Sequence, residues 1–245
     1  MNKTIKKIIG AAALFIIWSI AALIVNDEII LPSFVTVIKR LGKMIANGTI
    51  ITPTLITTYR VIIGVSISLL MAIITAYASY KLRLEDYLMP FISLLRTIPV
   101  ISTVLIVLFF TNKNTLSIIV IFFVSFPIIY ENVLTGLKEI QKQKLEMAKI
   151  YRISAAQKFK YIELPAIIKS TLLALAISFG LSFKAGSTAE VIAGAAGGLG
   201  DILYMAKISF EVTDLIAITF VIIFCSFVFE TITKYLYKKL GEKYD

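Results

Sequence analysis

Residues 137–170 read LKEIQKQKLEMAKIYRISAAQKFKYIELPAIIKS and form a long polar stretch between two apolar runs. No Gly or Pro interrupts the stretch before Pro165. Apolar residues recur within it at spacings of three or four, while Lys and Arg occupy other faces; these apolar residues are Leu145, Ala148, Tyr151, Ala155 and Phe159. The pattern predicts a continuous amphipathic helical element suited to docking in a partner's groove. A helix lying on the lipid surface is the alternative.

The sequence on either side of this stretch is strongly apolar. Of the 245 residues, 58% are hydrophobic and 16% are charged, against about 45–50% and about 25% in soluble domains. This composition excludes a disordered, collagen-like or disulfide-rich chain. Runs long enough to cross a hydrocarbon core of about 30 Å occupy residues 8–25, 55–79, 87–110, 116–136, 166–183 and 215–236. The sequence therefore predicts an all-α membrane protein with about six transmembrane helices in a single domain, residues 1–245.

The first 53 residues contain two different helical patterns. The run at residues 8–25 follows a basic start, and its 18 residues exceed the about 7–15 of a signal-peptide core. We therefore expect a retained span. Residues 26–53 are mixed in character, and Pro32 with Ser33 is typical of a helix start. A short amphipathic helix on the membrane surface is expected after Ser33.

The net charge of +10 is distributed unevenly over the segments between the runs. With the N-terminus placed inside the cell, the inside segments hold sixteen Lys and Arg, the outside segments hold six, and three lie within runs. This bias follows the positive-inside rule. We expect a multi-pass membrane protein with both termini and residues 137–165 in the cytoplasm. Contact with membrane lipid then accounts for the charge, without nucleic acid as a partner.

Ionisable residues within the runs are candidates for function, because each is costly in hydrocarbon unless it is paired or hydrated. Arg96 lies three residues before Pro99, where the helix should kink. It could contact an anionic substrate along a path, or pair with a carbonyl or a carboxylate. Arg60 is expected to snorkel to the outer headgroups, and Glu131 and Lys169 to do the same at the inner face.

Glu190 precedes a segment of small residues, 193–200, that contains four glycines. The segment is too short and too rich in Gly to cross a membrane, so we expect a re-entrant or surface stretch around Glu190, a second candidate for the substrate path. The glycines do not form a phosphate loop, because the chain has neither GxxxxGK[ST] nor a GxGxxG between a strand and a helix. Nucleotide hydrolysis is therefore not expected in this chain.

The residue types that catalysis and metal binding need are largely missing. The sequence has no His, and its single cysteine, Cys225, lies within an apolar run. No HExxH or GxSxG motif occurs, and no carboxylates in the runs have the spacing of an aspartyl dyad. We expect no catalytic residue, metal site or cofactor in the chain.

Residues 137–165 contain two short motifs that are separated by a fixed number of residues. Glu146-Met147-Ala148 is followed after three residues by Arg152, and after nine more by Ile162-Glu163-Leu164-Pro165. This resembles the EAA loop of permease subunits of ATP-binding-cassette (ABC) importers, which runs EAA, three residues, G, nine residues and I-x-LP. Met147 replaces an Ala of that pattern and Arg152 replaces its Gly. An Arg favours continuous helix where Gly allows a bend.

Further stretches extend the resemblance, to a MetI-like ABC permease fold and to the subgroup that imports nitrate, sulfonates, taurine and pyrimidine-type vitamin precursors. These stretches are Leu31-Pro32-Ser33, residues 59–64, residues 95–99, Ala189-Glu190 and Gly198-Leu199-Gly200. The resemblance implies an importer of the bacterial plasma (inner) membrane with a second permease copy, as a homodimer, and an extracytoplasmic solute-binding protein. It also implies cytoplasmic ATPase subunits that carry ATP and Mg²⁺.

The resemblance also implies roles for particular residues. It assigns coupling to the ATPase to a set within the EAA-like loop, namely Glu146, Ala148, Tyr151, Arg152, Ile162, Leu164 and Pro165. The expected solute is a small organic or inorganic anion or a pyrimidine-type vitamin precursor.

Two alternatives remain for the function. A secondary carrier would need ion-coupling carboxylates in its spans and often an inverted repeat, and neither is evident. A structural membrane protein would have no ATPase partner, so co-purification of an ATPase discriminates between these classes.

Overall fold

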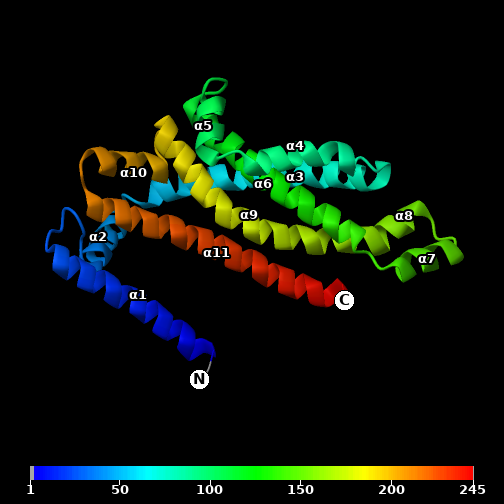
Figure 1. The fold of residues 1–245 in the computed structure, drawn as a ribbon, viewed down its shortest axis with the longest axis horizontal. Helices are drawn as coiled ribbons and strands as arrows, with labels where there is room; N and C mark the ends of the chain where they lie inside the picture. Colours follow the sequence, from blue (N-terminus) through cyan, green and yellow to red (C-terminus); the bar gives the residue numbers. More distant parts are fainter. Residues whose placement is uncertain (1–2, 245) are drawn as a thin grey trace.

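A computed structural model describes the backbone of residues 3–244 and the side chains of residues 9–240 except residue 11. Every regular element in this part is a helix (Figure 1), which confirms the predicted all-α class. The helices are α1 (Lys3–Val25), α2 (Phe34–Ala46), α3 (Ile51–Leu82), α4 (Glu85–Thr97), α5 (Val100–Leu108), α6 (Lys113–Lys138), α7 (Lys142–Ile150), α8 (Ala155–Lys158), η1 (Phe159–Glu163, a π-helix), α9 (Leu164–Ala193), α10 (Leu199–Ile208) and α11 (Val212–Tyr244).

Helices α3, α6 and α9 pack against one another, and α11 packs along α9. The three inner helices meet at Ile121 of α6, which is fully buried. A Cβ on Gly64 of α3 would lie 2.6 Å from Cγ2 of Ile121, and a Cβ on Gly186 of α9 would lie 2.8 Å from its Cδ1. Real Cβ atoms do not approach other atoms so closely, so glycine at both positions allows the helices to pack at this depth.

Among the described residues, four helices are long and apolar enough to cross a membrane: Ile51–Leu82, Lys113–Lys138, Ala155–Ala193 and Val212–Leu240. They contain the runs predicted at 55–79, 116–136, 166–183 and 215–236. Together α4 and α5 could make a fifth span, and Ala12–Val25 of α1 is a shorter apolar helix. The run predicted at residues 8–25 falls on α1, and the basic residues that precede it lie outside the described side chains.

The run predicted as one span at residues 87–110 is broken. Helix α4 ends at Thr97, α5 begins at Val100, and their axes are bent by 96°. Pro99 has no N–H to donate, and its ring disfavours helical backbone at the preceding residue. Ile98 accordingly adopts an extended ψ of 124°. The kink expected at Pro99 is confirmed, and the bend divides the run into the two helices α4 and α5.

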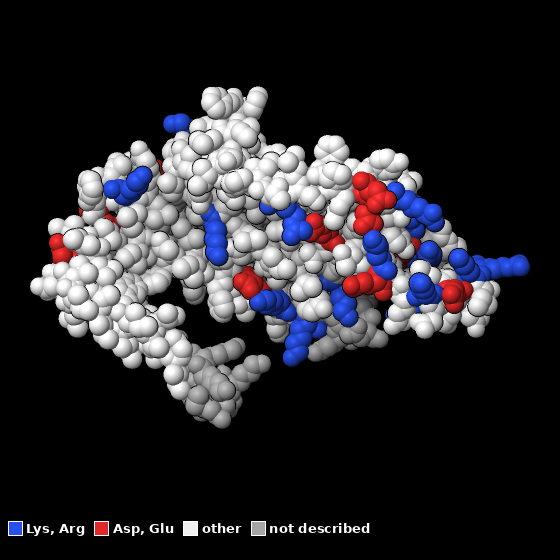
Figure 2. All heavy atoms as spheres, in the orientation of Figure 1, with Lys and Arg blue, Asp and Glu red and all other residues white. Residues whose placement is uncertain are grey.

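The two ends of the bundle differ in character. Helices α2 and α10 lie at one end and α7 and α8 at the other (Figure 1). The helix predicted after Ser33 is α2, which begins at Phe34. Ser33 caps its N-terminus, since the Ser33 Oγ accepts from the N–H of Thr36 at 3.2 Å. Trp18 of α1 donates its indole N–H to the Pro32 carbonyl at 3.1 Å. Figure 2 shows most of the visible Lys and Arg over the half of the molecule that carries α7 and α8.

Candidate functional site

Residues 142–158, which we call the elbow, consist of α7, a tight turn and α8. Arg152 in the turn adopts a left-handed φ of 48°. The N–H of Ile153 reaches back to the Ala148 carbonyl at 3.1 Å, which is the closing bond of a left-handed helix terminus. Ser154 then begins α8 with a capping box, in which Gln157 reaches back to the Ser154 N–H.

The expected continuous helix through this segment is therefore wrong. The backbone bends at Arg152, the position where the resembling family has Gly. Arginine pays a steric cost in left-handed backbone that glycine does not, but the bonds on both sides of the turn hold it there. The stripe from Leu145 to Phe159 consequently does not lie along one helix.

The residues predicted to couple the chain to an ATPase fall into two groups. Glu146, Ala148, Tyr151 and Arg152 lie on α7 and the turn, whereas Ile162, Leu164 and Pro165 lie on η1 and the start of α9. Ala148 is only 8% exposed and is covered by the chain itself, whereas Tyr151 is 74% exposed. Met147 and Ile150 are also exposed. We call Met147, Ile150 and Tyr151 the elbow patch.

Glu163 is a functional candidate that the sequence reasoning missed. Its side chain is 0% exposed and lies at the end of η1, between the elbow and α9. Lys81 of α3 donates to its Oε1 at 2.7 Å, and the Tyr77 hydroxyl of α3 donates to its Oε2 at 3.0 Å. Lys158 of α8 lies 3.5 Å from Oε1. An acidic residue immediately before Leu164-Pro165 was the available signal.

A second buried carboxylate lies toward the opposite end of the bundle. Glu190 of α9 is fully buried and accepts from the Arg60 guanidinium at 2.8 Å on Oε1. Its Oε2 accepts from the Thr57 hydroxyl at 2.8 Å and from the Gly200 N–H at 3.0 Å. Arg60 also donates to the Ala196 carbonyl at 3.2 Å. The network ties α3, α9 and the loop at residues 194–198 together.

This network corrects two expectations. Arg60 does not snorkel to headgroups; it is 7% exposed because a buried carboxylate and a carbonyl hold it inside. Glu190 does not lie in a re-entrant or surface stretch, since α9 continues without a break to Ala193 and ends at Gly194, whose φ is 60°. Both carboxylate oxygens of Glu190 accept hydrogen bonds from groups of the chain itself. The other candidate for the substrate path, Arg96, is more accessible.

Arg96 of α4 pairs with Glu131 of α6. The Arg96 side chain is 55% exposed and that of Glu131 is 23% exposed, so the pair remains accessible. The snorkelling expected for Glu131 is thus replaced by an ion pair. Glu131 also lines a cavity of about 910 Å³ between α6, α9 and the segment after α6, together with Asn132 and Lys169.

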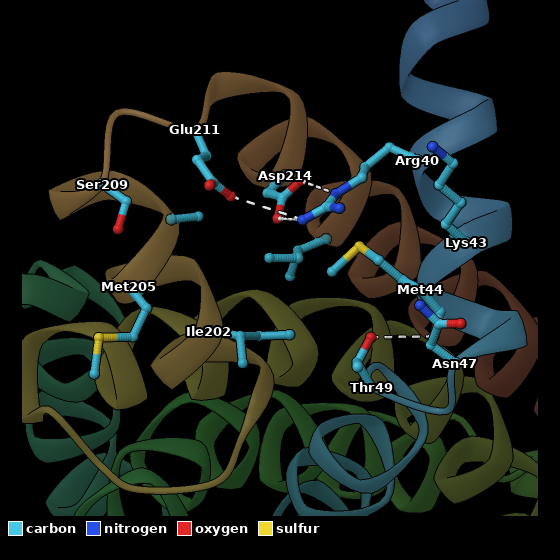
Figure 3. A pocket seen from close by; sticks show the side chains of 12 residues that line it. Arg40, Lys43, Met44, Asn47, Thr49, Ile202, Met205, Ser209, Glu211 and Asp214 are labelled. Atoms are coloured by element: carbon cyan, nitrogen blue, oxygen red, sulfur yellow. Dashed lines mark hydrogen bonds and ion pairs between the residues drawn. The ribbon is translucent and has the colours of Figure 1, made fainter.

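A separate pocket of about 310 Å³ lies between α2, α10 and α11 (Figure 3). Arg40 of α2 donates to both oxygens of Asp214 at the start of α11, from Nε at 2.6 Å and from Nη2 at 2.7 Å. The hydrogen bond to Asp214 raises the pKa of Arg40 further above its ordinary value. Figure 3 shows Glu211 beside this pair, with Met44 and Ile202 facing the pocket. This two-pronged pair fixes α2 against α11.

Long apolar helices packed around buried ion pairs, with a polar elbow at one end, define a multi-pass integral membrane protein. Residues 64–244 match the protein family described as the binding-protein-dependent transport system inner membrane component. The chain belongs to this family. It is therefore a permease component of a transport system rather than a catalytic chain, and the predicted class of ABC importer permease is confirmed.

Two known proteins are similar to the chain. It is 26% identical over 208 residues to the putative aliphatic sulfonates transport permease protein SsuC of Bacillus subtilis (strain 168), covering 82% of this chain and 74% of that protein. A chain of the MetNI methionine ABC transporter, solved in an inward-facing conformation, superposes with a TM-score of 0.60 and 18% identity. That match covers 76% of this chain and 91% of the other, which shows the MetI-like fold.

Proposed function

We propose that the chain forms the solute path of its importer and is driven by a cytoplasmic ATPase that docks on the elbow. The observation that carries this proposal is the elbow patch: Met147, Ile150 and Tyr151 are 55%, 75% and 74% exposed. They lie among charged residues on a segment that projects from the bundle (Figure 1). Clustered apolar side chains exposed in a polar segment are typical of an interaction site.

The remaining partners follow from this arrangement. The end with α7 and α8 faces the cytoplasm, in line with the Lys and Arg gathered over that half (Figure 2). The opposite end, with α2 and α10, faces the solute-binding protein. A second copy of the chain completes the path as a homodimer, and ATP with Mg²⁺ binds to the ATPase subunits. Both termini are cytoplasmic.

We propose a small sulfonate-type anion as the solute. The similarity to an aliphatic sulfonates permease supports this choice. Arg96 is the residue through which we test this choice: its side chain is 55% exposed beside a cavity of about 320 Å³, and a solute anion there would compete with Glu131 for its guanidinium. Nitrate, taurine and pyrimidine-type vitamin precursors are the other solutes that the resemblance suggests.

The docking is tested by purifying the permease with its ATPase in detergent and measuring the ATPase retained per permease. Tyr151→Asp places a charge in the elbow patch, and we expect at least about a tenfold loss of affinity, as for aromatic residues that dominate an interface. Lys142→Gln is the matched control, since it makes the same change of charge on α7 and leaves the elbow patch intact. Full retention of the ATPase by Tyr151→Asp would exclude the elbow patch as the docking site.

The solute is tested by uptake into proteoliposomes that contain the assembled transporter. Arg96→Gln should lower uptake of an alkanesulfonate while the complex and its basal ATP hydrolysis persist, because the Arg96 side chain is 55% exposed and an ion pair that solvent reaches contributes little to stability. Unchanged uptake would exclude Arg96 from the path. Loss of the assembled complex would show instead that the pair with Glu131 is structural.

A further inference from the structure

We propose that Tyr77, Lys81 and Glu163, which we call the anchor, transmit movement of the elbow to α3. This inference rests on the proposed docking of an ATPase on the elbow. The elbow continues through η1 into α9, so α9 follows any displacement of the elbow by covalent connection. The anchor gives α3 a second, non-covalent connection to the same point.

The anchor holds α3 and η1 together through several contacts at once. Both carboxylate oxygens of Glu163 accept from α3, at 2.7 Å from Lys81 and 3.0 Å from Tyr77. The Tyr77 ring also packs edge-on against Phe159 of η1, with ring centroids 5.5 Å apart. Charge, hydrogen bonding and packing thus join one turn of α3 to one turn of η1.

The backbone around Glu163 explains why the carboxylate is presented here. Pro165 cannot donate a backbone hydrogen bond, and its ring crowds the carbonyl four residues earlier. The helix widens before it, and the N–H of Leu164 bonds to the Phe159 carbonyl, five residues back. Such π-helical turns inside longer helices are frequent at functional sites. The widened turn holds Glu163 against the end of α3.

Because Glu163 is buried, the contact between Glu163 and α3 either stays intact or breaks completely. The Glu163 side chain is 0% exposed, so pulling it away from Lys81 and Tyr77 of α3 would leave a buried carboxylate with only the more distant Lys158, at 3.5 Å. Such a loss of charged hydrogen bonds at a buried group is unfavourable. When the ATPase displaces the elbow, moving α3 with it is easier than breaking this contact. The anchor therefore makes α3 and α9 move together at the elbow end of the bundle, and its residues act by positioning, without contacting the solute.

The test separates docking from transmission in proteoliposomes that contain the permease and its ATPase. Three quantities are measured for each variant: ATPase retained per permease, basal ATP hydrolysis, and solute transported per ATP hydrolysed. For Glu163→Gln and Lys81→Met we expect the first two to stay near wild type. Transport per ATP should fall at least about tenfold, the usual scale for loss of a charged hydrogen bond. Lys81→Arg keeps the positive charge, so this variant should retain most of the wild-type transport per ATP.

Lys158→Gln is the matched control. Lys158 also lies near Glu163, at 3.5 Å, but it belongs to α8, so its loss leaves the connection to α3 intact. Transport per ATP should stay near wild type in this variant. An equal loss in Lys158→Gln and Lys81→Met would overturn the proposal, since charge balance around Glu163, and not the link to α3, would then be what matters.

A covalent tether gives an independent readout. In a Glu163→Gln, Cys225→Ser background, Tyr77→Cys and Phe159→Cys place two thiols across the same contact. A short thiol-specific cross-linker should restore transport per ATP. Failure of a formed cross-link to restore it overturns the proposal, as does normal transport per ATP in Glu163→Gln. If Glu163→Gln releases the ATPase, the residue shapes the docking surface, which also overturns it. Failure of the wild-type chain to retain an ATPase would instead reject the proposed docking.

Discussion

Arg60 of α3 and Glu190 of α9 form an ion pair of 2.8 Å in which the two side chains are 8% and 0% exposed. The pair lies under the loop at residues 194–198, because Arg60 also donates to the Ala196 carbonyl and Glu190 accepts from the Gly200 N–H. A buried carboxylate therefore organises the loop between α9 and α10. Removing either partner would leave the other charge buried without compensation.

Loss of this pair should destabilise the chain severely. For Glu190→Gln we expect the free energy of unfolding to fall by about 3–5 kcal/mol, as for other broken buried pairs. The measurement is reversible unfolding in mixed micelles by titration with SDS. Glu85→Gln is the matched control, because its pair with Lys138 has side chains 33% and 52% exposed and should contribute only about 0–1 kcal/mol. Equal effects of the two substitutions would contradict the structural role of burial here.

Because α10 approaches Glu190 closely, adding one methyl group at Gly200 should destabilise the protein. A Cβ on Gly200 would lie 2.3 Å from Cβ of Glu190 and 2.6 Å from the Ser187 carbonyl oxygen. We expect Gly200→Ala to destabilise the protein by at least about 1–3 kcal/mol, as overpacking does. Gly42→Ala on α2 meets nothing within 4 Å and should be neutral or stabilising by up to about 1 kcal/mol. The temperatures at which the two variants aggregate in detergent provide the comparison.

The left-handed turn at Arg152 predicts opposite results for two substitutions. Arg152→Gly removes the steric cost of a φ of 48°, of about 1–2 kcal/mol, so the elbow should keep its shape and retain the ATPase. Arg152→Val places a β-branched residue where left-handed backbone is strongly disfavoured, and ATPase retention should fall. Equal retention by the two variants would show that the turn is not needed for docking.

The Arg40–Asp214 pair predicts a measurable coupling between α2 and α11. Arg40→Gln and Asp214→Asn should each lower the free energy of unfolding. The double variant should lower it by less than the sum of the two single decreases. Because Arg40 is 44% exposed, we expect a coupling energy near about 1 kcal/mol, smaller at high salt. A double-mutant cycle on SDS unfolding at low and high salt measures it. Additive effects would mean that the two side chains contribute independently.

Local sequence patterns predicted the features that local chemistry controls. The apolar runs identified the long helices because hydrocarbon thickness sets the length of a span. Ser33 marked the start of α2, since its hydroxyl satisfies an N–H that the helix leaves free. Pro99 marked a break, and the spacing from Glu146 to Pro165 indicated the permease family. Each of these signals depends on residues close together in the chain.

Contacts between segments that are far apart in the sequence could be identified only from the tertiary structure. Arg60 and Glu190 are 130 residues apart, and Lys81 and Glu163 are 82 apart. Either cation alone is as compatible with a lipid-facing position as with a buried one, because helix packing decides which face points inward. The 96° bend between α4 and α5 is likewise larger than the kink that a proline implies by itself.

The sequence by itself determined that this chain is an all-α membrane permease with a polar segment before the apolar run at residues 166–183, because hydropathy and motif spacing are properties of the linear chain. The tertiary structure alone decided that this segment bends at Arg152 and that Glu163 is joined to α3. The physical reason is that the buried charge of Glu163 persists only where partners from another helix stabilise it, and packing brings those partners together. The turn at Arg152 is held by backbone and capping hydrogen bonds on its two sides, which hydropathy does not reveal.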